Sequence, residues 1–129
     1  MAKQFVVQLK NEPGSLATLA ETLAARGVDL RAIGGGGSGD AGHVIMTTAD
    51  DDTTRAILEE GDYTYYEGES ILSEVDDRPG GMARIARDLA DAGVNIHGHL
   101  FLGRWGDRAM FAFVVDDPEK ARPILERKA

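Results

Sequence analysis

The chain contains an internal repeat. The dipeptide Pro13-Gly14 recurs as Pro79-Gly80, and this offset of 66 residues superposes further identical residues without a gap. Six further residues are each identical to the residue 66 positions later, namely Ala17, Ala20, Leu23, Ala24, Gly27 and Val28. The same offset places Asp50-Asp51 on Asp116-Asp117, which predicts loops of equal length in the two copies. The 129 residues therefore predict two copies of one small unit, at 1–67 and 68–129.

Each copy opens with a strand followed by a helix. Apolar and polar residues alternate over 5–10 and again over 71–75, as they do in strands with one buried face. Over 16–23 and 82–89 the apolar residues fall at i, i+3, i+4 and i+7, which predicts amphipathic helices. The proline of each repeat suits the first helical turn, and the glycine after each helix suits its end.

The rest of each copy predicts two strands and a second helix. In the first copy we expect a strand at 29–34, a flexible glycine-rich hairpin connection at 34–42, a strand at 43–48 and a helix at 53–60. In the second copy we expect strands at 95–104 and 108–115 and a helix at 118–128. This order begins the split βαβ, ferredoxin-like plan, which ends with a fourth strand.

A single segment, 63–67, is available as that fourth strand. It either completes the first unit or folds back as a hairpin onto 70–75 and completes the second. Because the repeat offset carries Tyr63 onto Ala129, the second copy would be one strand short. The pattern leaves both pairings open.

Composition narrows the class of partner. The net charge of −8 and pI of about 4.8 disfavour binding to nucleic-acid phosphates, which requires clustered Lys and Arg. The absence of cysteine excludes disulfides, thiolate nucleophiles and cysteine zinc sites. The first residues lack a signal-peptide pattern, and no apolar run approaches a membrane span. We therefore expect a soluble cytoplasmic protein with no nucleic-acid or membrane partner.

The strand-to-helix loops, 11–15 and 77–81, are the strongest candidate sites. Each leads into a helix N-terminus, where the first amides have no intrahelical partner and the helix dipole favours anions. The Pro-Gly pair lets main-chain amides face a small molecule without side-chain obstruction, so a ligand carboxylate fits there. The alternative interpretation is that Pro-Gly only makes the turn and starts the helix.

Three other motifs have functional and structural interpretations. His97 and His99 have a spacing that suits a divalent metal, but without a third ligand we interpret them as strand surface or as the wall of a ligand pocket. The glycine-rich run 34–39 lacks the Lys-Ser/Thr ending of a phosphate loop. The acidic run 50–52 suits a helix start better than a cation site. No metal or cofactor is predicted.

The duplicated motif resembles the ACT domain, the regulatory module of amino-acid-biosynthesis enzymes such as phosphoglycerate dehydrogenase and aspartate kinase. The resemblance rests on Pro-Gly followed by Leu or Met, an amphipathic helix, and then Gly-Val-Asp-Leu at 27–30 or Gly-Val-Asn-Ile at 93–96. It implies an α+β fold, in which two ferredoxin-like βαββαβ repeats form one extended antiparallel sheet with helices on one face.

The resemblance also implies a ligand site between the repeats. The residue two before Pro-Gly in one repeat and the polar residue after Gly-Val in the other would contact the effector, which pairs Asn11 with Asn95 and Asp77 with Asp29. One departure leaves the effector's identity open, because Leu9 and Val75 stand where the dehydrogenase pattern has a histidine. The implied ligand-binding set is Asn11, Glu12, Pro13, Gly14, Ser15, Leu16, Asp29, Asp77, Arg78, Pro79, Gly80, Gly81, Met82, Asn95, Ile96 and His97.

These observations predict a regulatory sensor of a free amino acid that has no catalytic machinery, because no convincing nucleophile and base are present. We also expect a homodimer, since a unit lacking one strand leaves an edge to cover, and a regulated enzyme of amino-acid metabolism as a further partner. Two alternatives remain open. In the first, the chain is a non-catalytic interaction subunit of such an enzyme. In the second, it is a small ferredoxin-like enzyme with a base such as His97.

Overall fold

The computed structural model describes residues 2–127 of the chain and has the expected α+β composition. The chain divides into two compact units, Ala2–Glu67 and a second that begins at Gly68. None of the described helices has both the length and the apolar run that a membrane span requires.

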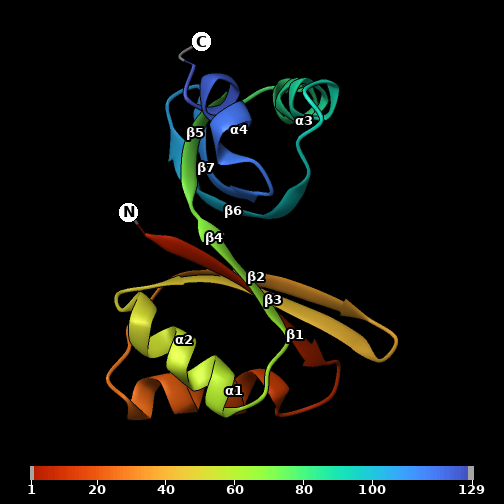
Figure 1. The fold of residues 1–129 in the computed structure, drawn as a ribbon. Helices are drawn as coiled ribbons and strands as arrows, with labels where there is room; N and C mark the ends of the chain where they lie inside the picture. The colour runs from red at the N-terminus through yellow and green to blue at the C-terminus, as the bar shows by residue number, and fades with distance from the viewer. Residues whose placement is uncertain (1, 128–129) are drawn as a thin grey trace. The chain divides into compact units, whose positions relative to one another are not determined.

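The first unit follows the complete βαββαβ order. Its sheet has the strand order β2-β3-β1-β4, and both helices cover the same face (Figure 1). A helix pair on one face of an antiparallel sheet buries that face and leaves the other polar. The elements are β1 (Lys3–Lys10), α1 (Ser15–Ala25), β2 (Leu30–Ser38), β3 (Ala41–Thr48), α2 (Asp51–Glu60) and β4 (Tyr65–Glu69).

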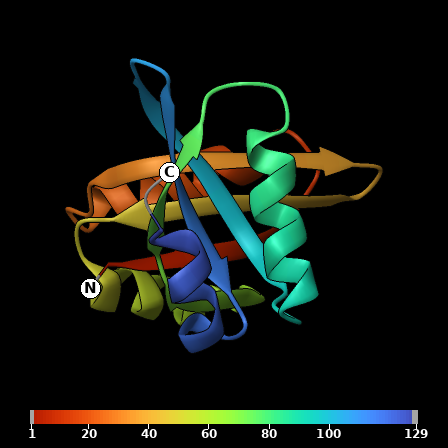
Figure 2. The ribbon, with the colours of Figure 1, turned by 90° about the horizontal axis from the view of Figure 1, so that it is seen from above.

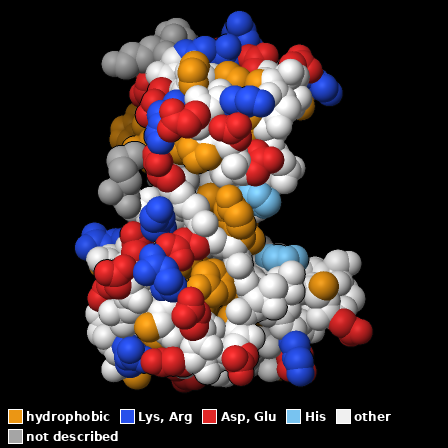
Figure 3. Space-filling model, in the orientation of Figure 1, with side chains coloured by type: hydrophobic (Ala, Val, Ile, Leu, Met, Phe, Trp, Pro, Cys, Tyr) orange, Lys and Arg blue, Asp and Glu red, His pale blue; other side chains and the backbone are white. Residues whose placement is uncertain are grey.

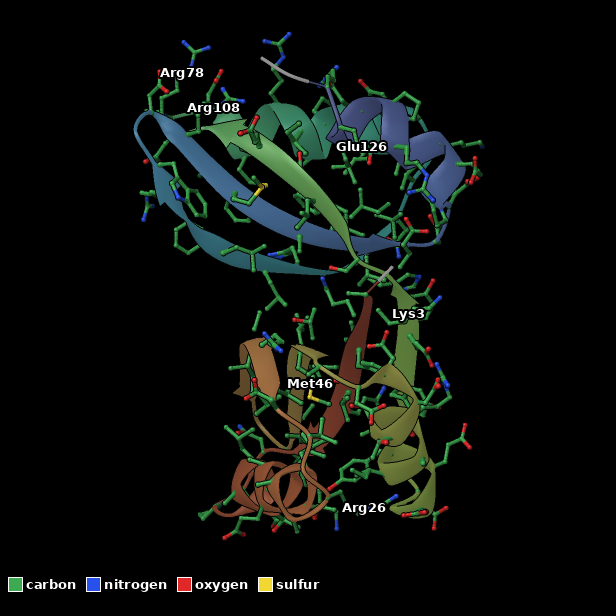
Figure 4. All side chains as sticks on the ribbon, turned by 90° about the vertical axis from the view of Figure 1, so that its left-hand side faces the viewer. Lys3, Arg26, Met46, Arg78, Arg108 and Glu126 are labelled. Carbon is green, nitrogen blue, oxygen red and sulfur yellow. The ribbon has the colours of Figure 1, made fainter. Side chains whose placement is uncertain are left out.

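The core of the first unit lies between its helices and its sheet. Met46 of β3, labelled in Figure 4, is fully buried there. Leu19 and Leu23 of α1 are also buried, as the helical period predicts, but Leu16 at the start of the same stripe is 50% exposed. The apolar stripe of α1 therefore extends beyond the core. The core side chains are Phe5, Val7, Leu19, Leu23, Val28, Val44, Met46, Ile57 and Leu58.

The second unit repeats the order as far as its second helix. Its sheet has the strand order β5-β7-β6, with both helices over one face (Figures 1 and 2). The last helix ends at Leu125, and Lys128 of the expected 118–128 helix lies outside the described residues. The elements are β5 (Ile71–Asp76), α3 (Gly81–Asp91), β6 (Ile96–Trp105), β7 (Arg108–Val115) and α4 (Pro118–Leu125).

The fourth strand belongs to the sheet of the first unit. β4 pairs with β1 at the sheet edge, and only Ser70 separates it from β5, so no hairpin turn joins β4 to β5. The described strands hydrogen-bond in two sheets, of four and three strands, where the resemblance implied one extended sheet. The two ACT-type repeats each have their own sheet and their own core.

The glycine run is part of a strand, which corrects the expected connection at 34–42. Gly34 to Gly37 pair in regular antiparallel register with Ile45 to Gly42 of β3. The hairpin turn consists only of Gly39 and Asp40, and Gly39 has a φ of 61°. Cross-strand hydrogen bonds hold these glycines extended although glycine has a low strand propensity.

The repeat offset changes from 66 to 67 inside β6. The residues from Ala41 to Thr48 correspond to Arg108 to Val115, because both strands pair with their neighbours in the same way. The additional residue is Leu102, which has no partner in the register between Phe101 and Gly103 and forms a β-bulge. The expected match of Asp50-Asp51 with Asp116-Asp117 is therefore wrong by one residue.

The two helix caps agree with the shifted offset. Asp50 caps α2 by accepting a hydrogen bond from the Thr53 amide at 3.0 Å, and Asp117 caps α4 by accepting one from the Lys120 amide at 3.2 Å. The capping interpretation of the acidic run is thus confirmed at Asp50. The hydroxyl and amide of Thr53 also lower the pKa of Asp50 by stabilising its carboxylate.

Candidate ligand-binding groove

The loop between β1 and α1 is a tight turn that ends at the helix start. The Ser15 amide donates to the Glu12 carbonyl at 3.4 Å, and Gly14 at the third turn position has φ 90° and ψ −13°. This is the type II geometry, which selects proline second and glycine third. The helix begins at Ser15, so Pro13 precedes the cap instead of occupying the first helical turn. The amides of Leu16 and Ala17 have no intrahelical acceptor.

The second loop has the same geometry. The Gly81 amide donates to the Arg78 carbonyl at 3.1 Å, and Gly80 has φ 93°. Pro79 likewise precedes the helix, which begins at Gly81. A side chain at Gly81 would place its Cβ 2.1 Å from the Asp76 carbonyl oxygen, so this position accepts only glycine without rearrangement. The turn type favours proline followed by glycine in both units, because Gly14 and Gly80 both have a positive φ.

A groove of about 450 Å³ lies in the first unit beside this loop. The size falls within the usual range for sites that bind small molecules. Its walls come from the loop, the start of α1 and the facing strands β2 and β3. The lining residues are Leu9, Lys10, Asn11, Glu12, Ser15, Leu16, Ile33, Gly34, Gly35, Gly36, Gly37, Gly42, His43 and Val44.

The glycines of β2 leave the space that forms the groove. Gly35 pairs with Val44, and Gly37 pairs with Gly42, so these two positions lie on the same face of the sheet as the core. A Cβ at Gly35 would lie 2.4 Å from the His43 carbonyl oxygen, and one at Gly37 would lie 2.7 Å from Cγ of Asn11. Substitution at either position would therefore force a rearrangement.

Asn11 has a fixed orientation at one end of the groove. Its Nδ2 donates to the Gly39 carbonyl at 2.9 Å, which leaves Oδ1 directed toward the space above Gly37. As an amide carbonyl oxygen, Oδ1 can only accept hydrogen bonds. The other polar residues that line the groove are Lys10, Glu12, Ser15 and His43.

Apolar side chains form the opposite part of the wall. Leu16 of α1 is 50% exposed, and Ile33 of β2 is 47% exposed although it pairs with the buried Met46. Both residues line the groove. Leu9 is partly buried against the core, and Val44 is buried. Burial of these surfaces by a ligand would contribute about 25 cal/mol per Å². The groove thus combines an apolar wall with main-chain and side-chain polar groups.

A wider depression of about 780 Å³ lies on the other side of the same loop. The residues that it shares with the groove are Leu9, Lys10, Glu12, Ser15, Gly42 and His43. It is lined further by Pro13 and Gly14 of the loop and by the charged residues Asp40 and Asp62. We take the groove as the candidate site because, unlike the depression, it brings the exposed apolar side chains of Leu16 and Ile33 next to the loop.

The corresponding positions of the second unit carry large side chains. With the shifted offset, Gly35 corresponds to Phe101, and Gly37 corresponds to Arg104. The Phe101 ring lies edge-on to Phe111, with centroids 5.5 Å apart, and the Arg104 guanidinium lies 4.8 Å from the Phe101 centroid. Arg104 Nε also donates to Asp77 Oδ2 at 2.9 Å. Asp77 is the counterpart of Asn11.

The other expected residues of the second loop make contacts within their own unit. Arg78 pairs with Asp76 at 3.2 Å, and Arg108 pairs with the other oxygen of the same carboxylate. Figure 4 shows Arg78 and Arg108 at the same end of the second unit. Met82 is partly buried against the core. Arg78, Pro79, Gly80 and Gly81 also line a smaller cavity of about 270 Å³.

The expected residues after the helices lie away from the loops. Asp29 directly precedes β2 and pairs with Arg31 at 3.4 Å, whereas Asn11 contacts Gly39 beyond the far end of that nine-residue strand. Asn95 holds the equivalent place before β6, where its main-chain N–H donates to Asp116 Oδ1 at 2.9 Å. Asn11 and Asp29 therefore share no site within the first unit. The pairings of Asn11 with Asn95 and of Asp77 with Asp29 across the units remain predictions.

The histidine pair lies on β6 in the second unit. His97 and His99 are both exposed, and the His99 ring lies 6.4 Å from the Phe113 ring. Ile96 packs against the core beside them. Among residues 2–127 no group of three or more His, Asp or Glu side chains is arranged to hold a metal ion. On the face shown in Figure 3, Lys and Arg side chains are interspersed with Asp and Glu.

Sequence reasoning missed the glycine strand and its apolar neighbours as parts of the site. Ile33, the glycines 34–37, His43 and Val44 all line the groove, but none of them belongs to the Pro-Gly motif. The available signal was Ile33 followed directly by four glycines, since a strand without side chains leaves space on both faces.

Comparison with known proteins agrees with this architecture. Residues 3–60 match the model of the ACT domain. Residues 3–60, which make up most of the first unit, therefore form an ACT domain. No curated protein matches the chain.

Solved structures match the fold of both units. A protein from Bacteroides thetaiotaomicron has 22% identity and a TM-score of 0.71, with 97% of this chain and 86% of that chain covered. The regulatory subunit of aspartate kinase from Thermus thermophilus has 18% identity and a TM-score of 0.63, with 96% and 87% covered. A structure of aspartokinase alpha and beta subunits has 18% identity and a TM-score of 0.62, with 96% and 89% covered. At these identities the likeness establishes a shared tandem ACT-type fold.

Proposed function

We propose that this protein is a regulatory sensor that binds a free amino acid in the groove of the first unit. The observation that carries the proposal is the groove itself, in which an unpaired helix amide, an oriented acceptor and an apolar wall surround one space. These are the three kinds of group that a zwitterion with a side chain requires.

Each part of an amino acid has a matching part of the groove. The Leu16 amide at the positive end of α1, which has no intrahelical acceptor, suits the carboxylate. Asn11 Oδ1 and the Glu12 carboxylate are acceptors for the ammonium group. The ligand needs no chemical change to make these contacts, so the proposal assigns the protein no catalytic step.

A binding screen tests the proposal. The twenty amino acids are screened by thermal shift, because a ligand that binds only the folded state raises the melting temperature. The best ligand is then measured by calorimetry against wild type and Asn11→Ala, with Asp77→Ala as the matched control in the second unit. Loss of one hydrogen bond to a charged group should weaken binding by about 1.5 to 3 kcal/mol, roughly tenfold or more, in Asn11→Ala only. Equal affinities in all three proteins would show that the ligand does not use the loop.

A second candidate role is that of a non-catalytic subunit of an enzyme of amino-acid metabolism. The observation that favours it is the extent of the match, which covers 96% of this chain and 87% of a protein described as the regulatory subunit of aspartate kinase. We also expect a homodimer, which light scattering across a wide concentration range tests directly. In the subunit role, an enzyme activity copurifies with the tagged protein and changes when the screened amino acid is added. Copurification without that response would contradict regulation by the amino acid.

A further inference from the structure

The two units have the same loop but differ in what lies over the sheet beside it. In the first unit Gly35 and Gly37 leave the groove open, and Asn11 faces it. In the second unit the equivalent positions are Phe101, Arg104 and Asp77. A β-bulge at Leu102 lies between the two large residues, and bulges redirect the side chains next to them.

The three side chains of the second unit form a connected group. The Phe101 ring packs edge-on against Phe111, and the cationic Arg104 covers the ring while it pairs with Asp77. An amino acid with a large apolar side chain has the same two features. Its side chain resembles the ring that lies over the strand, and its ammonium group resembles the cation that pairs with the loop residue. In the first unit, the counterparts of Phe111 and Asp77 are Val44 and Asn11, which line the open groove.

We infer that Phe101 and Arg104 are an internal occupant of the second unit, and that the first unit binds one amino acid with a large apolar side chain in the equivalent place. This inference rests on the proposed function and specifies its ligand class and stoichiometry. The ligand's ammonium takes the position of the Arg104 cation and contacts Asn11 Oδ1. Its side chain takes the position of the Phe101 ring, against Ile33, Val44 and Leu16.

The wall of the groove favours this class of ligand over small or charged amino acids. Ile33 and Leu16 are each about half exposed without a ligand, and a side chain of the size of Leu or Phe covers them. Each buried methylene group contributes about a fourfold gain in affinity. We therefore expect Phe and Leu to bind at least tenfold more tightly than Ser, Asp or Lys.

Calorimetry of the full chain tests both the ligand class and the number of sites. The probes are L-Phe, L-Leu, L-Ser, L-Asp and L-Lys, titrated into wild type, Ile33→Ser and the matched variant His99→Ser, which changes the equivalent position of β6. We expect one site per chain, a loss of about five- to tenfold for L-Phe and L-Leu in Ile33→Ser, and unchanged affinity in His99→Ser. Leu16→Gln, at another half-exposed position, should weaken the same two ligands and provides a second variant if Ile33→Ser folds poorly.

The outcomes separate this inference from the proposed function. If a small polar or charged amino acid binds as tightly as L-Phe, or if two ligands bind per chain, the sensor role survives but the internal-occupant inference is wrong. If affinity for L-Phe is equal in wild type, Ile33→Ser and Leu16→Gln, the ligand does not contact the apolar wall and the inference also fails. If none of the twenty amino acids binds, the proposed function fails.

Discussion

The first and second units differ most where their frameworks agree best. The Pro-Gly turns are nearly identical, with φ of 90° at Gly14 and 93° at Gly80. In the strand that follows each first helix, however, the first unit has four consecutive glycines, and the second has Phe101 and Arg104 on either side of a bulge. The difference shows that a duplicated turn can lie beside an open groove in one unit and beside large side chains in the other. The residues of the facing strand determine whether the space beside the turn is open.

The cores of the two units should respond alike to truncation, and this is the largest effect that we expect. Leu23 and Leu89 occupy equivalent positions and are 1% and 0% exposed. Leu23→Ala and Leu89→Ala should each reduce the free energy of unfolding of their own unit by about 2 to 5 kcal/mol, because each leaves a cavity. Chemical denaturation followed by far-UV circular dichroism measures both. A loss below about 1 kcal/mol in one variant would break the equivalence of the two cores.

Removal of the Phe101 ring should have an intermediate effect confined to the second unit. The ring is 48% exposed and packs against Phe111, so Phe101→Ala should lower stability by about 1 to 2 kcal/mol. Trp105 is the only tryptophan and lies in the same strand, so its fluorescence reports the unfolding of this unit.

The neighbouring variant Arg104→Ala, which breaks an exposed ion pair, should lower stability by less than about 1 kcal/mol in the same measurement. An unchanged midpoint in Phe101→Ala would mean that filling this space does not stabilise the second unit.

A small effect is expected at two arginine–glutamate pairs, whose arginines correspond between the units and whose glutamates both lie on β4. Arg55 of α2 forms two hydrogen bonds to Glu67, and Arg122 of α4 forms two to Glu69. Arg55 lowers the pKa of Glu67 below its ordinary value of 4.5 by stabilising the carboxylate. The stabilisation is therefore present above about pH 4.5 and is lost as the pH falls through the lowered pKa of the folded state.

Glu67→Gln should accordingly lower the free energy of unfolding by about 1 kcal/mol at pH 7. The expected loss is small because the Arg55 side chain is 35% exposed and solvent screens its attraction to the carboxylate. The difference between wild type and variant should shrink as the pH falls below about 4.5. Thermal melts at pH 7 and pH 3 measure it, and Glu69→Gln, which removes the β4 partner of Arg122, is the matched variant. A difference that persists unchanged at pH 3 would exclude the carboxylate charge as its cause.

Local rules were sufficient for the features that repeat. The alternation over 5–10 and the helical period over 16–23 predicted β1 and α1, and the acidic residues before α2 predicted its cap. The Pro-Gly pair predicted a turn at a helix start, although the helix begins after the glycine. These features depend on residues that are neighbours in the chain, so a single sequence contains the information that specifies them.

The remaining features depend on residues that are distant in sequence. Pairing with β1 assigned β4 to the first sheet, and pairing with β3 made a strand of four glycines whose own propensity favours a loop. The bulge at Leu102, which moved the offset by one residue, became visible only from the register with β7. Leu16 fits the apolar period of α1, but it faces a groove because the strand beside it has no side chains to cover it. The sequence by itself thus determined the repeat and its local elements. The tertiary structure decided which of the two copies has an open groove, because strand pairing determines which side chains fill the space beside each turn.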